Sequence, residues 1–86
     1  MILKFHKHFL KAYQKLSSKE QDKVDERLRI FVKSPFDEAL ENHALSGKYQ
    51  GYRSINITGD QRAIYFHLEK EKVMFVRIGT HSQLYG

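Results

Sequence analysis

The chain has 86 residues, of which 41% are hydrophobic, and its 15 Lys and Arg against 10 Asp and Glu give a formal net charge of +5. This length excludes a second domain, so we expect one domain over residues 1–86, with an open site suited to a polymer. The charge favours a nucleic acid, an anionic lipid or an acidic protein as partner, without choosing among them. With no cysteine and no apolar run long enough for a signal peptide or membrane span, the sequence predicts a cytoplasmic protein without disulfides.

The first part of the chain predicts one strand and two helices. The apolar residues 1–5 are compatible with a strand, and apolar side chains then recur at helical spacing over residues 6–16. A second helix begins in the Ser-Ser-Lys-Glu-Gln stretch at residues 17–21, which offers a capping box in two registers. It ends at Ser34, because the residue before Pro35 is disfavoured in the α region.

The rest of the chain predicts a loop and three strands. Residues 36–47 are polar and mixed, with at most one helical turn around 37–40. The period then changes from 3.6 to 2. We expect strands over 49–58, 62–68 and 73–78, joined by turns at 58–61 and 69–72, with Gly79 ending the last strand and a tail from 80 to 86.

The resulting order, βααβββ, indicates an α+β domain with two helices packed on one face of a small, largely antiparallel sheet. Alternation places Ile55 and Ile57 in the core, so Asn56 is expected on the outer face, towards Arg77. The same rule predicts that Ile64, Phe66, Leu68, Met74, Val76 and Ile78 face the helices. It predicts that Ala63, Tyr65, His67, Val73, Phe75 and Arg77 face outward.

Several catalytic patterns are missing. The sequence has no Gly-rich phosphate loop, no metal-binding His or carboxylate spacing and no nucleophile elbow. Asp60 is the lone acid between Lys48 and Leu68, which argues against a two-metal nuclease. If the chain is an enzyme, we expect it to use neither a metal nor another cofactor.

The second half instead carries residues that suit RNA cleavage. RNA supplies its own nucleophile, the 2′-hydroxyl, so an enzyme need only move protons and neutralise the phosphate. His titrates near neutral pH, Arg matches phosphate oxygens and an aromatic ring stacks a base. The candidates are His43, Lys48, Arg53, Arg62, Arg77, His81 and Tyr85.

Some of these candidate residues also have simpler explanations that involve no function. A loop histidine such as His43 is often only a surface residue, and His67 inside a strand is better explained as structural or solvated. Arg77 is a stronger candidate, because a charge within an apolar strand is costly without a partner or a function.

Lysines recur every four residues along the first helix and beyond, and no acid precedes Glu20. On a helix this spacing makes one basic stripe. It is either a solvated face or a track for structured RNA, recognised through its phosphates. The stripe predicted to bind the ribosome consists of Lys7, Lys11, Lys15 and Lys19.

Four short motifs resemble the RelE/ParE toxin superfamily, and its YafQ branch in particular. They are His-Ala-Leu-Ser-Gly at 43–47, Gly-Tyr-Arg-Ser at 51–54, Ala-Ile-Tyr at 63–65 and Val-Arg-Ile-Gly-Thr-His-Ser-Gln-Leu-Tyr-Gly at 76–86. The last is the most specific, since Gly-Tyr-Arg and Arg-x-Ile-Tyr are shared by superfamily members that are not nucleases. The order βααβββ agrees with a RelE-like fold, so the resemblance spans the chain.

The resemblance implies the toxin of a type II toxin–antitoxin system. Such a toxin is a ribosome-dependent mRNA endoribonuclease, or mRNA interferase. It acts in the A site of the 30S subunit, inhibits translation and is neutralised by a cognate antitoxin. The matched motifs imply active-site roles for His43, His81 and Asp60, a phosphate-binding role for Arg77 and a terminal aromatic at Tyr85, which is usually Phe in this branch.

Further RNA or phosphate contacts are expected from Lys48, Arg53, Asn56 and Arg62. Two residues depart from the branch: Asn56 stands where a His is frequent, and Gln61 stands where an aromatic is common. Because Asn does not exchange protons near neutral pH, any acid–base role there must move or be lost.

Two other functions compete with the nuclease. One is a ParE-like inhibitor of DNA gyrase that cuts nothing, since both groups share the fold. The other is an RNA-binding, toxin-like protein with reduced activity, which the Asn56 departure keeps open. The pair His43 and His81 favours the nuclease.

Overall fold

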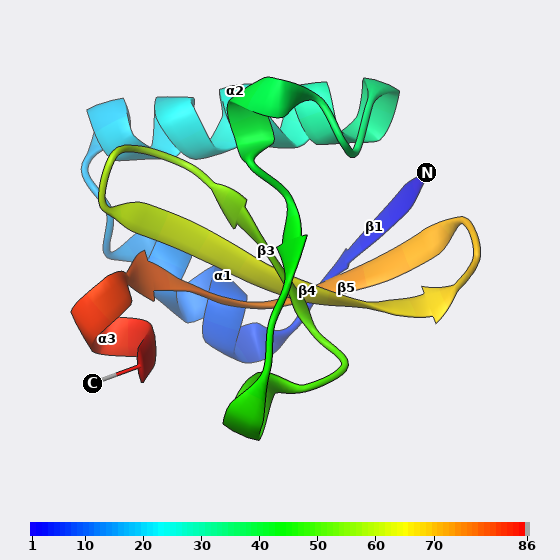
Figure 1. Cartoon of the computed structure of the whole chain (residues 1–86). Helices are drawn as coiled ribbons and strands as arrows, with labels where there is room; N and C mark the ends of the chain where they lie inside the picture. The colour runs from blue at the N-terminus through cyan, green and yellow to red at the C-terminus, as the bar shows by residue number, and fades with distance from the viewer. Residues whose placement is uncertain (86) are drawn as a thin grey trace.

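The computed structural model describes residues 1–85, which form a five-stranded sheet in the order β1-β5-β4-β3-β2 (Figure 1). The strands are β1 (Ile2–Phe5), β2 (His43–Ala44), β3 (Arg53–Asn56), β4 (Gln61–Glu69) and β5 (Lys72–Thr80). The helices are α1 (Lys7–Gln14), α2 (Ser18–Lys33) and α3 (His81–Tyr85), with 3₁₀ turns η1 (Glu38–Leu40) and η2 (Gly47–Tyr49). Only β1 and β5 run parallel, which confirms the predicted α+β class and largely antiparallel sheet.

The two N-terminal helices lie close to their predicted bounds. Of the two capping boxes that the sequence offers, the chain uses the first. The Ser17 hydroxyl accepts a hydrogen bond from the Glu20 N–H at 3.2 Å, and the Glu20 carboxylate accepts one from the Ser17 N–H at 2.9 Å. Such reciprocal bonds satisfy two backbone donors that the first turn leaves free. At the other end, α2 stops at Lys33, two residues before Pro35.

Both helices bury their apolar stripes against one face of the sheet, with α2 lying along that face (Figure 1). Phe31 of α2 sits edge-on against Tyr65 and Phe75, with ring centroids 4.9 and 5.3 Å apart. Edge-to-face aromatic pairs of this kind add to the stabilisation from burial. The other buried members of this core are Phe9, Val24, Leu40, Ile55, Ile57, Ala63, Val73 and Ile78.

The predicted faces of β4 and β5 are mostly wrong. Ala63, Tyr65, Val73 and Phe75 belong to the helix-facing core, although alternation placed them outside. Of the residues predicted to face the helices, only Ile78 belongs to that core. The remaining residues that were predicted to face the helices do not belong to this core. They are Ile64, Phe66, Leu68, Met74 and Val76.

Two features explain this error. First, Ile64 pairs with Arg77 but Tyr65 pairs with Phe75, which leaves Val76 as an extra residue in a β-bulge. The bulge changes the phase of β5, so Phe75 and Ile78 face the same side despite their odd spacing. Second, Ile64 is fully buried outside the main core, so β4 is apolar on both faces and alternation does not distinguish them.

The C-terminal part also differs from its prediction. The strand expected over 49–58 covers only Arg53–Asn56. Before it the chain forms η2, which begins at Gly47 and is followed by Gly51, and both glycines have a positive φ. Gly79 does not end β5, which continues to Thr80. A Cβ on Gly79 would lie 2.7 Å from Gln83 Oε1, so this glycine instead lets α3 pack closely on the strand.

Candidate functional site

A small hollow of about 190 Å³ on the outer face of the sheet, which we name the histidine hollow, brings together side chains that are distant in sequence. Its position follows from the pairing of β2 with β3, which sets His43 opposite Ser54, and from the packing of α3 on the end of β5. The lining residues are His43, Leu45, Ser54, Arg62, His81 and Tyr85. Four residues that the sequence singled out, His43, Arg62, His81 and Tyr85, therefore meet here.

The His43 ring is oriented by the backbone. Its Nδ1 lies 2.9 Å from the carbonyl oxygen of Glu41. Because a carbonyl oxygen only accepts hydrogen bonds, Nδ1 must carry the proton and donate. The exposed ring therefore has Nε2 free as an acceptor in its neutral form, which is the state of a general base.

His81 and Tyr85 lie on successive turns of α3, with ring centroids 4.7 Å apart. His81 is exposed and Tyr85 is half-buried. Burial raises the pKa of the Tyr85 hydroxyl, against weaker opposing effects of Ser54 and Arg62. The phenol therefore keeps its proton at neutral pH and acts as a hydrogen-bond donor.

Arg62 and Ser54 provide polar groups in the floor of the hollow. The Nη1 of Arg62 donates to the carbonyls of Thr58, Gly59 and Gln61 at 3.0 to 3.2 Å, which fixes the guanidinium beside the β3–β4 turn. Ser54 is 1% exposed, and its hydroxyl lies close enough to the Tyr85 phenol to lower the pKa of that group by hydrogen bonding.

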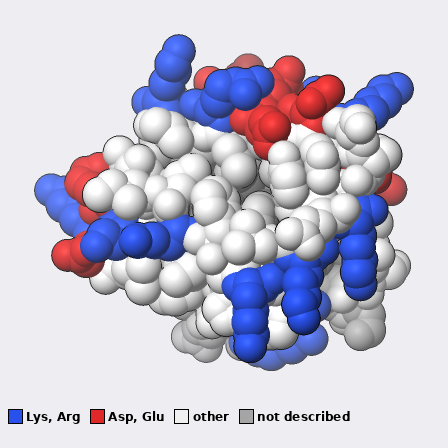
Figure 2. All heavy atoms as spheres, turned by 180° about the vertical axis from the view of Figure 1, so that it is seen from behind, with Lys and Arg blue, Asp and Glu red and all other residues white. Residues whose placement is uncertain are grey.

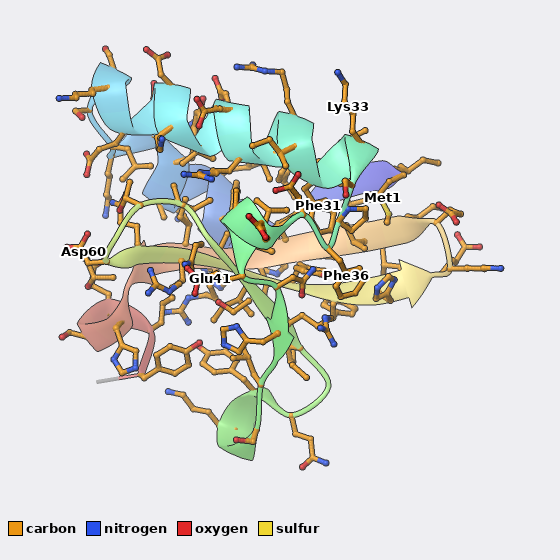
Figure 3. All side chains as sticks on the ribbon, turned by 45° about the horizontal axis from the view of Figure 1, so that its top comes forward. Met1, Phe31, Lys33, Phe36, Glu41 and Asp60 are labelled. Atoms are coloured by element: carbon orange, nitrogen blue, oxygen red, sulfur yellow. The ribbon has the colours of Figure 1, made fainter. Side chains whose placement is uncertain are left out.

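Asp60 and Gln61 lie outside the histidine hollow. Asp60 is exposed at the β3–β4 turn, where its carboxylate accepts a hydrogen bond from the Thr58 hydroxyl at 3.2 Å (Figure 3). Gln61 is buried and donates to the Glu20 carboxylate at 3.1 Å, so it ties the sheet to the first turn of α2. Where the family pattern has an aromatic, this chain therefore has an amide in a structural contact.

Asn56 faces outward as predicted, but Arg77, the neighbour that we expected, is not among its partners. Its amide donates to the carboxylate of Glu41, and across the hairpin it pairs with Arg62 rather than Arg77. Glu41 has a positive φ of 45°, which turns the chain into β2 and aims its side chain at β3 (Figure 3). Sequence reasoning missed Glu41, because only the fold brings it to Asn56.

Arg53 lies in a structural network rather than in the hollow. Its Nε donates to the Asn42 side-chain oxygen at 2.8 Å, and its guanidinium stacks on Phe36 at 5.2 Å. The Asn42 amide in turn donates to the buried Tyr65 hydroxyl at 2.8 Å and to the Pro35 carbonyl at 2.9 Å. Asn42 thereby anchors the segment that carries His43.

Replacing Asn42 with Ala is expected to lower the free energy of unfolding by about 1–3 kcal/mol, because the Tyr65 hydroxyl and Arg53 lose their partner. Urea unfolding of the variant checks this value. The exposed amide of Asn56, replaced in the same way, is the matched control and is expected to cost less. A loss for Asn42→Ala no larger than that of the control would contradict the anchoring role.

Arg77 lies in a neighbouring depression, not in the histidine hollow. This depression, which we name the tyrosine groove, has a volume of about 340 Å³. Arg77 and Lys48 supply its cations, while Tyr49, Tyr52 and Phe66 supply its aromatic surface. The Arg77 side chain is exposed and forms no ion pair within the described chain.

The predicted lysine stripe is shorter than four residues. Lys7 and Lys11 lie on α1 and Lys15 caps its C-terminus, whereas Lys19 belongs to α2 and does not continue the row. The prediction was wrong on this point because it extended one helical period across the turn between two helices. Lys11, Lys15 and Arg77 line a groove along α1.

Positive charge dominates this side of the molecule. Burial lowers the pKa of His8, and the positive charges of His6, Lys7, Arg77 and Lys11 lower it further. Figure 2, a view from behind, shows basic side chains next to one another low on this face and acidic ones gathered above, where α2 lies. The α1 side is therefore suited to phosphates.

Within residues 1–85, no group of three His, Asp or Glu side chains is arranged to hold a metal ion. None of the described helices combines the length and the apolar character required to cross a bilayer.

The chain is similar to known toxins over its whole length. A family model described as a bacterial toxin of type II toxin-antitoxin system, YafQ, matches residues 1–86. A curated Haemophilus influenzae protein named as a toxin YafQ is 38% identical over an alignment of 52 residues, and this alignment covers 57% of this chain. The match covers 51% of that protein, so it spans about half the length of this relative.

Solved structures show the same fold. YafQ from E. coli strain BL21(DE3) superposes with a TM-score of 0.79 at 25% identity, over 98% of this chain and 97% of that chain. A chain of the E. coli DinJ–YafQ toxin–antitoxin complex gives 0.76 at 25% identity, over 98% and 96%. A YoeB/ParE toxin from Agrobacterium tumefaciens, at 21% identity over 94% and 99%, shares the fold with a TM-score of 0.78. Because the family model spans the whole sequence, this chain belongs to the YafQ family of bacterial toxins of type II toxin–antitoxin systems.

Proposed function

We propose that this toxin is a ribosome-dependent mRNA endoribonuclease that inhibits translation in the cytoplasm. One observation carries the proposal: the histidine hollow brings two histidines, a guanidinium and a protonated tyrosine to a site small enough for one phosphate. Arg and His are the side chains that RNA cleavage through the 2′-hydroxyl requires. The open surface around the hollow suits a polymer presented in the A site of the 30S subunit.

We assign the chemical steps to these residues as follows. Nε2 of His43 accepts the proton of the 2′-hydroxyl, and the 2′-oxygen forms a bond to phosphorus. The bond from phosphorus to the 5′-oxygen breaks, and His81 protonates that oxygen as it leaves. The products are a 2′,3′-cyclic phosphate and a free 5′-hydroxyl.

The remaining residues of the hollow stabilise charge. Arg62 faces the phosphate oxygens, and the Tyr85 hydroxyl donates a hydrogen bond to them. Asn56 does not titrate, and its exposed amide is bonded to Glu41, so we assign it no proton transfer. We assign no proton transfer to Asp60, since it does not line the hollow.

A cognate antitoxin is the second partner that we propose. The E. coli relative of the same fold was solved as a complex of YafQ with DinJ. The net charge of +5 favours an acidic protein as the neutralising partner.

Induced expression of the chain is expected to cut messages within open reading frames, and the upstream fragments are expected to end in a 2′,3′-cyclic phosphate. Primer extension locates the cuts, and treatment of the fragments with a phosphatase that opens cyclic ends identifies the terminus. The double variant His43→Ala/His81→Ala is the control. A 5′-phosphate on the downstream fragment would refute the mechanism, and intact messages with a DNA-damage response would favour gyrase inhibition.

A further inference from the structure

Five aromatic rings form a continuous row on the outer face, from the histidine hollow into the tyrosine groove. The ring of His81 contacts Tyr85, Tyr85 contacts Tyr49, Tyr49 contacts Tyr52 and Tyr52 contacts Phe66. Successive centroids are 4.7, 5.5, 5.9 and 5.3 Å apart. None of the five residues is fully buried, and His81 is exposed.

A hydrogen bond and the contacts between neighbouring rings fix the row in place. The Tyr49 hydroxyl donates to the carbonyl of Leu84 at 3.3 Å, which joins η2 to α3. From Tyr85 onward, the three ring pairs meet nearly edge to face, at angles of 89°, 78° and 67°. This geometry orders the rings relative to one another.

Cations flank the far end of the row, in the tyrosine groove. Lys48 Nζ lies 5.3 Å from the centre of the Tyr49 ring. Arg77 lies on the other side, on β5 beyond its last pairing with β1 at Phe75. No carboxylate is among the residues that line the groove within the described chain.

We propose that the tyrosine groove is a second subsite for single-stranded RNA, which binds the nucleotide next to the one cleaved in the histidine hollow. The base stacks on the face of Tyr52 while the Tyr49 ring meets the edge of the base, and the phosphate lies between Lys48 and Arg77. The inference rests on the proposed nuclease function, because it takes the histidine hollow as the place of cleavage. It also gives a role to Arg77, which the hollow itself does not use.

The combination of rings and cations favours RNA over an acidic peptide. A row of aromatic rings beside positive charges is how proteins hold single strands, since every base has a face that stacks. A double helix does not fit, because its bases are stacked on one another and not free to reach the rings. An acidic peptide would use the cations and leave the rings without a function.

The test measures binding of a six-nucleotide 2′-O-methyl oligoadenylate, which is not cleavable, and of an abasic strand of the same length and charge. Wild type is expected to bind the oligoadenylate about 5- to 100-fold more tightly than the abasic strand, as expected for stacked bases. Tyr52→Leu should lose that preference, and Tyr52→Phe, which keeps the ring, should retain it. The wild-type comparison needs no variant to fold.

Three results would overturn the subsite. They are equal binding of both strands by wild type, no binding of either, and equally tight binding of a hexapeptide of Asp and Glu. Cleavage on programmed ribosomes separates this inference from the proposed function. If messages stay intact while the base preference depends on Tyr52, the nuclease proposal fails and the RNA subsite stands. If messages are cut but Tyr52→Leu cuts as fast as wild type, the subsite fails alone.

Discussion

His81→Ala should cut mRNA about 10²- to 10⁴-fold more slowly than wild type, the usual loss when one general acid or base is removed. The effect is large because the 5′-oxygen leaves poorly without a proton, and His81 is the exposed histidine on α3 that we assign to it. Binding to ribosomes should change little, since the ring contributes little contact area. Single-turnover rates on programmed ribosomes measure the chemistry, and sedimentation with ribosomes measures the binding.

His67→Ala is the matched control for this experiment. His67 is an exposed histidine on β4 whose Nδ1 lies 3.3 Å from the carbonyl of Glu69, and it is not part of the hollow. It should cut at the wild-type rate. His43→Ala is expected to lose less than His81→Ala, because water can take the place of a base more easily than of an acid. Cleavage by His81→Ala within about threefold of wild type would remove His81 from the mechanism, since this is far below the expected loss.

The two N-terminal helices were predictable because their signals are local, whereas α3 lies where only a tail was expected. A capping box, a period of 3.6 and a proline that ends α2 lie within the segments that they control. The signal for the η1 turn was equally local, since the Asp37 carboxylate caps the turn by accepting a hydrogen bond from the Ala39 N–H.

The faces of the sheet were not predictable by alternation. The rule needs one polar face, and here Ile64 and Leu84 are buried outside the core that packs on α1 and α2. The bulge at Val76 adds a second obstacle, because nothing in an apolar run marks which residue is the extra one. The end of the last strand was mispredicted at Gly79 for a related reason. Glycine occurs both at strand ends and where two elements pack closely, and here Gln83 of α3 lies against Gly79.

The candidate site was predictable in its residue types and only partly in its arrangement. The motifs identified His43, His81, Arg62 and Tyr85, which the structure brings together. They did not identify the contacts that position them. Glu41 and Asn42 act through residues far along the chain, so no local pattern reveals them. The sequence offered one signal for them. Glu41 and Asn42 come immediately before His43, in a segment that is too polar to belong to the hydrophobic core.

The basic edge of α1 gives the second large effect that we expect. The triple variant Lys7→Gln, Lys11→Gln, Lys15→Gln should bind ribosomes much more weakly at low salt. Each phosphate contact contributes roughly 0.7–0.9 to the slope of log affinity against log salt, through release of bound counterions. Three lost contacts should therefore reduce that slope by about 2–3. Lys19 is left intact, because it lies on α2 and outside the row.

The control for this variant removes the same amount of charge elsewhere, at Lys23, Lys33 and Lys70. Lys23 and Lys33 lie on α2, and Lys70 lies in the turn between β4 and β5. If the row on α1 contacts ribosomal RNA, the control keeps its salt slope although its net charge falls equally. Equal losses in the two variants would show that only the overall charge matters. An unchanged slope in the α1 variant would show that these lysines are merely solvated.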